Sequence, residues 1–139
     1  MFQDRDQMRA FYSQVLHKHR KRQSLEPMEQ MLLGVILLHP EYHEMLDNSE
    51  GSVQQEFTVE NGQTNPFLHM GMHVAIREQV SIDRPEGIRG IHQKLVERLG
   101  ESEAEHRMME CLGEMLWNSQ RNNTPPDELA YLECIRKLA

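Results

Sequence analysis

Apolar residues recur every three or four positions along successive segments of the chain, which is the spacing of an amphipathic α-helix. Phe11 and Val15 show this spacing near the N-terminus, and Ile91 and Leu95 show it in the second half. No comparable run of alternating apolar residues predicts an extended sheet. The pattern therefore predicts an all-α fold: a single domain over residues 1–139, built as a bundle of six to seven helices.

Local signals place the expected helix boundaries. Pro27 suits the first position of a helix, because its missing N–H would have no partner there. Pro40 keeps the preceding residue out of helical geometry, so the chain either kinks there or starts a new short helix over 40–47. Gly100 predicts a helix end, and Ser102 with Glu105 forms an S-x-x-E capping box that predicts the next start.

The segment of residues 48–64 has the least regular pattern. It opens with NSEGS, which is typical of a loop, and continues with EFTVENGQT, which alternates like a strand before an Asn-Gly pair. No clear partner strand follows. The sequence therefore predicts one irregular but ordered loop with a single short strand.

Charge and hydropathy narrow the classes of partner. The formal net charge of -7 argues against broad binding to nucleic acid or anionic membranes. The exception is the basic run HKHRKR, residues 17–22, which is either a solvated helix end or a contact for nucleic acid or an acidic partner. The longest apolar run, residues 31–38, falls short of the roughly 20 residues of a membrane span. A protein partner or a homo-oligomer stays open.

The two cysteines give no recognisable motif. Cys111 and Cys134 are far apart and form no CxxC pair, so we predict neither a disulfide framework nor a thiolate metal site. The first residues, MFQDRDQMRA, are polar and do not resemble a secretory signal. Together these features predict a cytoplasmic protein.

A histidine pair lies inside the best-marked helix of the chain. Asn65 can cap this helix and Pro66 fits its first position. His69 and His73 are four residues apart, so both rings lie on the same helix face, which Ile76 continues. The two imidazoles are therefore expected to point toward the rest of the protein.

Other histidines supply candidate partners for this pair. His39 and His43 have the same spacing upstream, and His106 lies on a later helix. Zinc takes three or four nitrogen, oxygen or sulfur ligands, and two histidines on one rigid helix supply half of a tetrahedral set. The sequence therefore predicts a metal site, for zinc or iron, using at least three of these histidines. The alternative is a hydrogen-bonded histidine cluster that holds no metal.

Charged residues follow the pair on the same helix. Glu78 is a candidate further ligand or general base. Arg77 and Arg84 can hold an anionic substrate or an inner carboxylate, and the alternative is an ion-pair network at the helix end. The chain contains none of the common nucleophile, P-loop or dinucleotide-binding motifs, so the sequence assigns no enzymatic activity.

Two blocks, GVILLHPEYH and NPFLHMGMHVAIREQVSIDRPEGIR, resemble a small family of uncharacterised proteobacterial proteins, described as a domain of unknown function. This resemblance covers nearly the whole chain and implies a bacterial cytoplasmic protein, but no activity. The order H-x-x-x-H then R-E-Q also resembles the metal-binding helix of DinB-type four-helix bundles, as far as Gln79. If the ligand roles of that helix apply to this chain, the second resemblance implies that His39 or His43 is the third ligand beside His69 and His73.

The resulting hypothesis is a helical bundle with a buried histidine-rich site that holds one zinc or iron ion. If the protein is an enzyme, metal-assisted hydrolysis or group transfer is the expected chemistry. Two other functions remain open. One is a non-enzymatic interaction protein with structural histidines, and the other is a nucleic-acid-associated factor that uses residues 17–22.

Overall fold

A computed structural model describes residues 5–48 and 65–139, and every regular element within these ranges is helical. The predicted all-α fold is therefore confirmed, whereas the predicted loop and strand of residues 48–64 lie almost entirely outside the described residues. The helices are α1 (Arg5–Arg20), α2 (Pro27–Leu37), the 3-10 helix η1 (Pro40–Tyr42), α3 (His43–Asp47), α5 (Pro66–Ile82), α6 (Ile88–Leu99), α7 (Glu101–Asn122) and α8 (Glu128–Leu138).

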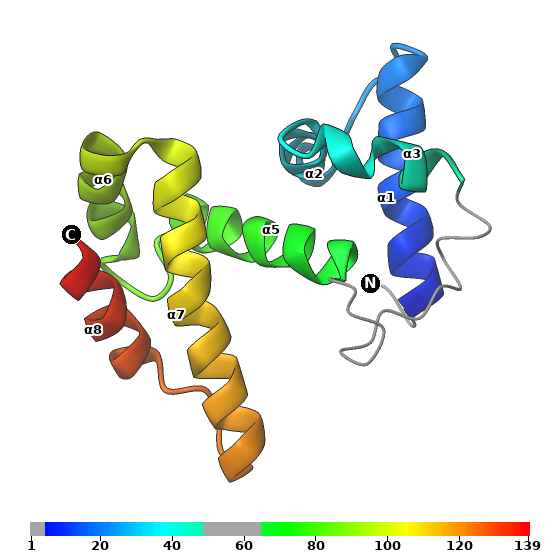
Figure 1. Ribbon diagram of the computed structural model, residues 1–139. Coiled ribbons are helices and arrows are strands. Elements are labelled where there is room, and N and C mark those ends of the chain that lie inside the picture. Colours follow the sequence, from blue (N-terminus) through cyan, green and yellow to red (C-terminus); the bar gives the residue numbers. More distant parts are fainter. Residues whose placement is uncertain (1–4, 49–64) are drawn as a thin grey trace. The chain divides into compact units, whose positions relative to one another are not determined.

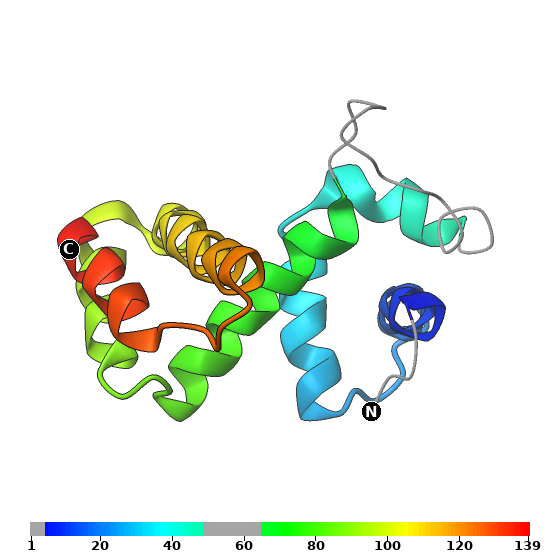
Figure 2. The same cartoon turned by 90° about the horizontal axis from the view of Figure 1, so that it is seen from below.

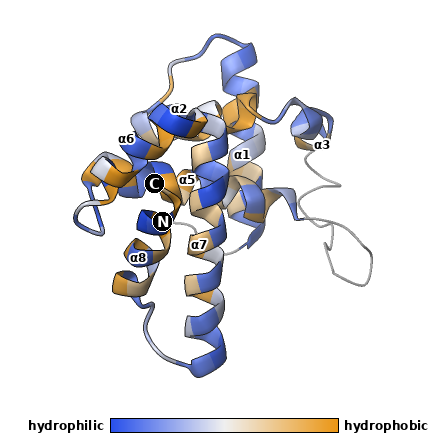
Figure 3. Ribbon diagram, turned by 60° about the vertical axis from the view of Figure 1, so that its left-hand side comes forward, coloured by the Kyte–Doolittle hydropathy of each residue, from blue (hydrophilic) through white to orange (hydrophobic). Residues whose placement is uncertain are grey.

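The chain divides into two compact units, Met1–Val74 and Ala75–Ala139, and the boundary falls inside α5. We describe each unit by itself, and the expectation of one domain over 1–139 stays a prediction. Hydrophobic and hydrophilic residues alternate along the helices of both units (Figure 3), as the sequence pattern predicts. No helix in the described part of the chain combines the length and the apolar character needed to cross a membrane.

In the first unit, α1 and α2 cross at a steep angle, and α3 packs against α1 (Figures 1 and 2). Leu37, the last residue of α2, and Leu38 directly after it are exposed. The first turns of α5 complete the core. Its buried side chains are Tyr12, Val15, Leu16, Leu32, Val35, Ile36, Leu46, Phe67 and Met70.

The start of α2 is fixed by a buried carboxylate. Glu29 accepts a hydrogen bond from the backbone N–H of Glu26 at 2.9 Å and pairs with Lys18 of α1 at 2.8 Å. These two contacts, the backbone bond first, hold the pKa of the Glu29 carboxyl below its usual range, against the opposing effect of burial. The carboxylate thus joins the ends of α1 and α2.

A break in the helix follows at His39. Its backbone angles, φ -126° and ψ 66°, are not helical, as expected for a residue that precedes a proline. Pro40 then opens η1, which leads directly into α3. Of the two alternatives predicted for this point, the new short helix is the one observed.

The N-terminus of α5 is capped as predicted. The side-chain oxygen of Asn65 accepts hydrogen bonds from the backbone N–H groups of Phe67 at 3.0 Å and Leu68 at 3.2 Å. Phe67 lies edge-on to Tyr12, with ring centroids 5.6 Å apart, and beneath the guanidinium of Arg9 at 4.9 Å. These contacts fix the start of α5, and with it the two histidines that follow, against α1.

The second unit contains the rest of α5 with α6, α7 and α8, and α7 and α8 run antiparallel side by side (Figure 1). Tyr131 of α8 is fully buried and donates a hydrogen bond of 2.6 Å to Gln79 of α5, and burial raises the pKa of its phenol. Trp117 of α7 is exposed. The buried apolar side chains are Ile76, Ile88, Ile91, Leu95, Ala104, Met108, Met109, Cys111, Leu112, Tyr131, Leu132 and Ile135.

One predicted helix start is wrong. α7 begins at Glu101 directly after Gly100, whose positive φ of 86° reverses the chain after α6. Ser102 therefore lies within the first turn of α7 and not at its cap. Because a glycine turn already ends one helix and begins the next, no residue remains between them for the S-x-x-E cap.

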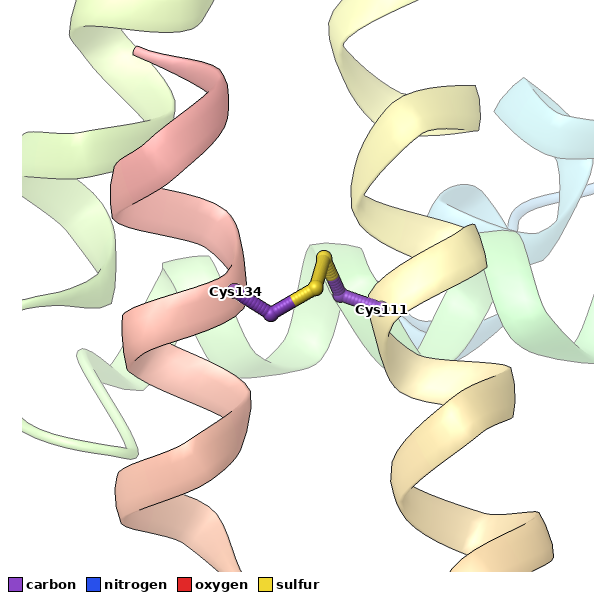
Figure 4. Close-up of a disulfide and its surroundings, with 2 residues drawn as sticks. All are labelled: Cys111 and Cys134. Atoms are coloured by element: carbon purple, nitrogen blue, oxygen red, sulfur yellow. A yellow bond between two sulfur atoms is a disulfide. The ribbon is translucent and has the colours of Figure 1, made fainter.

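The prediction about the cysteines is also wrong. Cys111 of α7 and Cys134 of α8 form a disulfide, with an S–S distance of 2.05 Å and Cα atoms 5.9 Å apart (Figure 4). The two residues are 23 positions apart in the sequence, and only the antiparallel packing of α7 and α8 brings them together. The disulfide therefore cross-links the second unit.

Candidate metal centre

Three histidine rings meet inside the first unit. Nε2 of His69 lies 3.1 Å from Nε2 of His39 and 3.2 Å from Nε2 of His73. The ligand nitrogens of all three rings lie within 4.8 Å of one another. His39 is 5% exposed and His73 is fully buried, so the cluster is largely shielded from solvent.

Two separate elements supply these rings. His69 and His73 are one turn apart on α5, which places their side chains on the same face as predicted. His39 comes from the break between α2 and η1, where the non-helical backbone turns its side chain toward α5. The structure thus joins one predicted histidine pair with one member of the other.

The protonation of His39 follows from its partner. Nδ1 of His39 lies 2.8 Å from the carbonyl oxygen of Val35. A carbonyl oxygen only accepts, so Nδ1 must carry a proton and donate it. In a neutral ring, Nε2 then has a lone pair, and this lone pair faces His69. Histidines that bind metal through one ring nitrogen typically donate a hydrogen bond of this kind from the other nitrogen.

If all three rings are neutral, the two N–N contacts cannot both be ordinary hydrogen bonds. If Nε2 of His69 carries a proton, that single proton faces both His39 and His73. If it carries a lone pair instead, it meets the lone pair of His39 at 3.1 Å. One cation that accepts all three lone pairs removes the conflict.

The spacing of the nitrogens fits a transition-metal ion. Ligands about 2.1 Å from an ion are about 3.4 Å apart at tetrahedral angles and about 3.0 Å apart at right angles. The observed separations of 3.1 and 3.2 Å lie between these values. Imidazole is a suitable ligand for zinc, iron, copper and nickel. The two contacts of His69 therefore have the spacing of ligands that share one metal ion.

An aromatic side chain covers one face of the cluster. Tyr42 is stacked on His39, with centroids 5.2 Å apart and an angle of 3° between the rings, and it lies edge-on to His69 at 6.4 Å. Partial burial raises the pKa of the Tyr42 phenol, and the nearby Glu41 carboxylate adds to the effect. Tyr42 was not among the site residues predicted from the sequence, although its position in HPEYH between two candidate histidines was a usable signal.

His43, a further predicted ligand, is turned elsewhere. Its Nε2 donates to the carbonyl oxygen of Ile36 at 2.9 Å, and it is not part of the histidine group found among the described residues. The i, i+4 argument fails here because His39 is outside the helix, so the two rings do not share a helical face.

His106 belongs to the second unit and is described within it. Its Nδ1 donates to the carbonyl oxygen of Ser102 at 2.9 Å, one turn earlier on α7. In a neutral ring this bond leaves Nε2 as the unprotonated nitrogen. Its role as a metal ligand stays a prediction from the sequence.

The charged residues after the histidine pair separate into two environments. Arg77 donates from Nε to both carboxylate oxygens of Glu105, at 3.1 and 3.2 Å, and Glu105 is only 2% exposed. The alternative that Arg77 holds an inner carboxylate is therefore confirmed. Glu78 and Arg84 are exposed, and the role of Glu78 as ligand or general base stays a prediction.

The basic run at the end of α1 makes ion pairs within the first unit. Lys18 pairs with Glu29, and Arg20 pairs with Asp47 of α3. Two of the cationic side chains that a nucleic-acid contact would use are thus paired with carboxylates of the same chain. This arrangement matches the predicted solvated helix end better than a continuous basic surface.

Comparison with known proteins adds a family but no activity. No curated protein sequence and no solved structure matches the chain. One family does match, over residues 4–137, and it is described as a domain of unknown function. Because the match covers nearly the whole sequence, this chain belongs to the family of the domain of unknown function DUF1841.

Proposed function

We propose that this protein binds one divalent transition-metal ion, zinc or iron, through Nε2 of His39, His69 and His73. The observation that carries the proposal is the convergence of three Nε2 atoms through contacts of 3.1 and 3.2 Å, which neutral rings cannot both make as ordinary hydrogen bonds with one another. Burial of His39 and His73 adds support, because it shields the cluster from most of the solvent.

The number of ligands suggests what the ion does. Structural zinc sites use four protein ligands, whereas catalytic sites use three and keep a position for water or substrate. A three-imidazole site therefore fits an ion that supplies Lewis acidity or activates water. The proposed chemistry is metal-assisted hydrolysis or group transfer.

Elemental analysis tests the proposal directly. The untagged protein, purified without chelator, is expected to contain close to one zinc or iron ion per chain, or to take up one when either ion is added. The double variant His69→Ala/His73→Ala is expected to lose it. His43→Ala is the matched control, since His43 is a neighbouring histidine whose ring nitrogen bonds to Ile36.

Two outcomes would contradict the proposal. One is the absence of metal together with no uptake of added zinc or iron by a folded protein, as judged by circular dichroism. The other is equal metal content in the wild type and the double variant. If the histidines bind no metal, the search for a function moves to protein partners.

A further inference from the structure

A cleft in the second unit reaches the disulfide. It has a volume of about 410 Å³ and lies between α7 and α8, next to the turn that joins them. Cys111 and Cys134 both line it, with Asn118 and Tyr131 among the other lining residues. The S–S bond lies in the space between the two helices (Figure 4). The disulfide is therefore at the wall of a cavity and not enclosed in the core.

The two sulfur-bearing residues differ in exposure. Cys111 is 3% exposed, whereas Cys134 is half-buried. Thiol–disulfide exchange requires an incoming thiolate to reach one sulfur in line with the bond, so access decides which sulfur is attacked. The geometry therefore favours attack on Cys134 and departure of Cys111.

The charge of the cleft selects among thiols. Glu114 and Asp127 line it, and its described lining includes no lysine or arginine. Carboxylates repel an anionic thiol and attract a cationic one, and this effect is screened by salt. A thiol with a positive or neutral body is thus favoured over one with an acidic group.

We propose that the Cys111–Cys134 disulfide is a thiol-exchange site, at which a small thiol without negative charge enters the α7–α8 cleft and attacks Cys134. The thiolate sulfur bonds to Sγ of Cys134, the S–S bond breaks, and Cys111 leaves as a thiolate that takes a proton from water. A second thiol then attacks the mixed disulfide and releases Cys134. Overall, the protein disulfide is reduced to two thiols while two small thiols are oxidised to their disulfide.

The regiochemistry is tested by trapping each cysteine separately. The variants Cys111→Ser and Cys134→Ser, folded and without denaturant, are treated with cystamine, the disulfide of cysteamine. Mass spectrometry is expected to show mixed-disulfide formation at least about tenfold faster in Cys111→Ser, which keeps the accessible thiol. Equal rates, or a faster reaction in Cys134→Ser, would overturn the assignment.

The cleft itself is tested on the wild-type protein. Cysteamine is expected to reduce the disulfide a few-fold faster than 2-mercaptoethanesulfonate at equal thiolate concentration, and 1 M salt is expected to remove the difference. Asn118→Phe, which fills the cleft, is expected to slow both reactions, whereas Gln120→Phe on the same helix outside the cleft is not. Reduction at the rate of global unfolding, identical for both thiols and both variants, would show that the cleft plays no part.

Discussion

His39 donates a hydrogen bond of 2.8 Å from Nδ1 to the carbonyl oxygen of Val35, one helical turn before it. This bond fixes the ring so that Nε2 faces the two histidines of α5. Second-shell bonds of this kind hold metal ligands in place, and losing one alone weakens metal binding about 10- to 100-fold. The backbone of α2 thus orients the third imidazole of the proposed centre.

Removal of the His39 side chain is expected to weaken metal binding more than loss of its hydrogen bond to Val35. We predict that His39→Ala raises the dissociation constant for zinc by more than about 100-fold, because even the loss of an outer partner costs 10- to 100-fold. His43→Ala is expected to change it by less than about threefold, which is the scatter expected for a residue outside the ligand set. Competition with a chromogenic chelator measures both constants, and similar losses in the two variants would remove His39 from the site.

Acid is expected to weaken the α1–α2 junction through Glu29. Its folded-state pKa is lowered, so its carboxylate stabilises the fold above the unfolded value of about 4.3, and the contribution is lost as pH falls through the folded pKa. We predict that Glu29→Gln lowers the free energy of unfolding at pH 7, and that the deficit shrinks below about pH 4. Urea unfolding of both proteins at a series of pH values measures this difference in the free energy of unfolding. The exposed Glu44→Gln is the control, and a deficit that stays constant with pH would refute the prediction.

The pairing of Arg77 with Glu105 is expected to be costly to break. Glu105 is 2% exposed, and removing the partner of a buried charge typically costs about 3–5 kcal/mol. We predict a loss of about 3 kcal/mol in unfolding free energy for Arg77→Met. Arg107→Met, which breaks the exposed i, i+4 pair with Glu103, is expected to cost much less, because water screens an exposed ion pair. Equal effects in the two variants would show that burial does not matter here.

The disulfide is expected to contribute to stability through chain entropy. Closing a loop with a sequence separation of 23 corresponds to about 3 kcal/mol at 25 °C. We predict that Cys111→Ser/Cys134→Ser lowers the free energy of unfolding by this amount, measured in urea. Added dithiothreitol should destabilise the wild type to the same level and leave the double variant unchanged. A wild type insensitive to dithiothreitol would contradict the prediction.

The parts of the fold that local chemistry determines were predictable from the sequence. Pro27, and Asn65 with Pro66, mark helix starts within a few residues, and both helices begin as those residues indicate. The pairing of His69 with His73 is likewise a property of one helix. Such features need no knowledge of how distant segments pack.

The parts that were missed depend on packing or on a single backbone residue. The disulfide required knowing that α7 and α8 lie antiparallel with Cys111 opposite Cys134. His43 seemed equivalent to His39 because both fit a helical spacing, yet the proline at 40 takes His39 out of the helix. The choice of His39 as the partner of the α5 pair was thus open until the bend was known.

The disulfide also makes residues 111–134 a closed covalent ring that contains the exposed turn between α7 and α8. A protease that cuts this turn, where exposed backbone is most readily cleaved, would leave two pieces still joined through sulfur. Such a nicked molecule migrates as one band on a non-reducing gel and as two after reduction. Damage at this turn is therefore invisible to size analysis until the cross-link is opened.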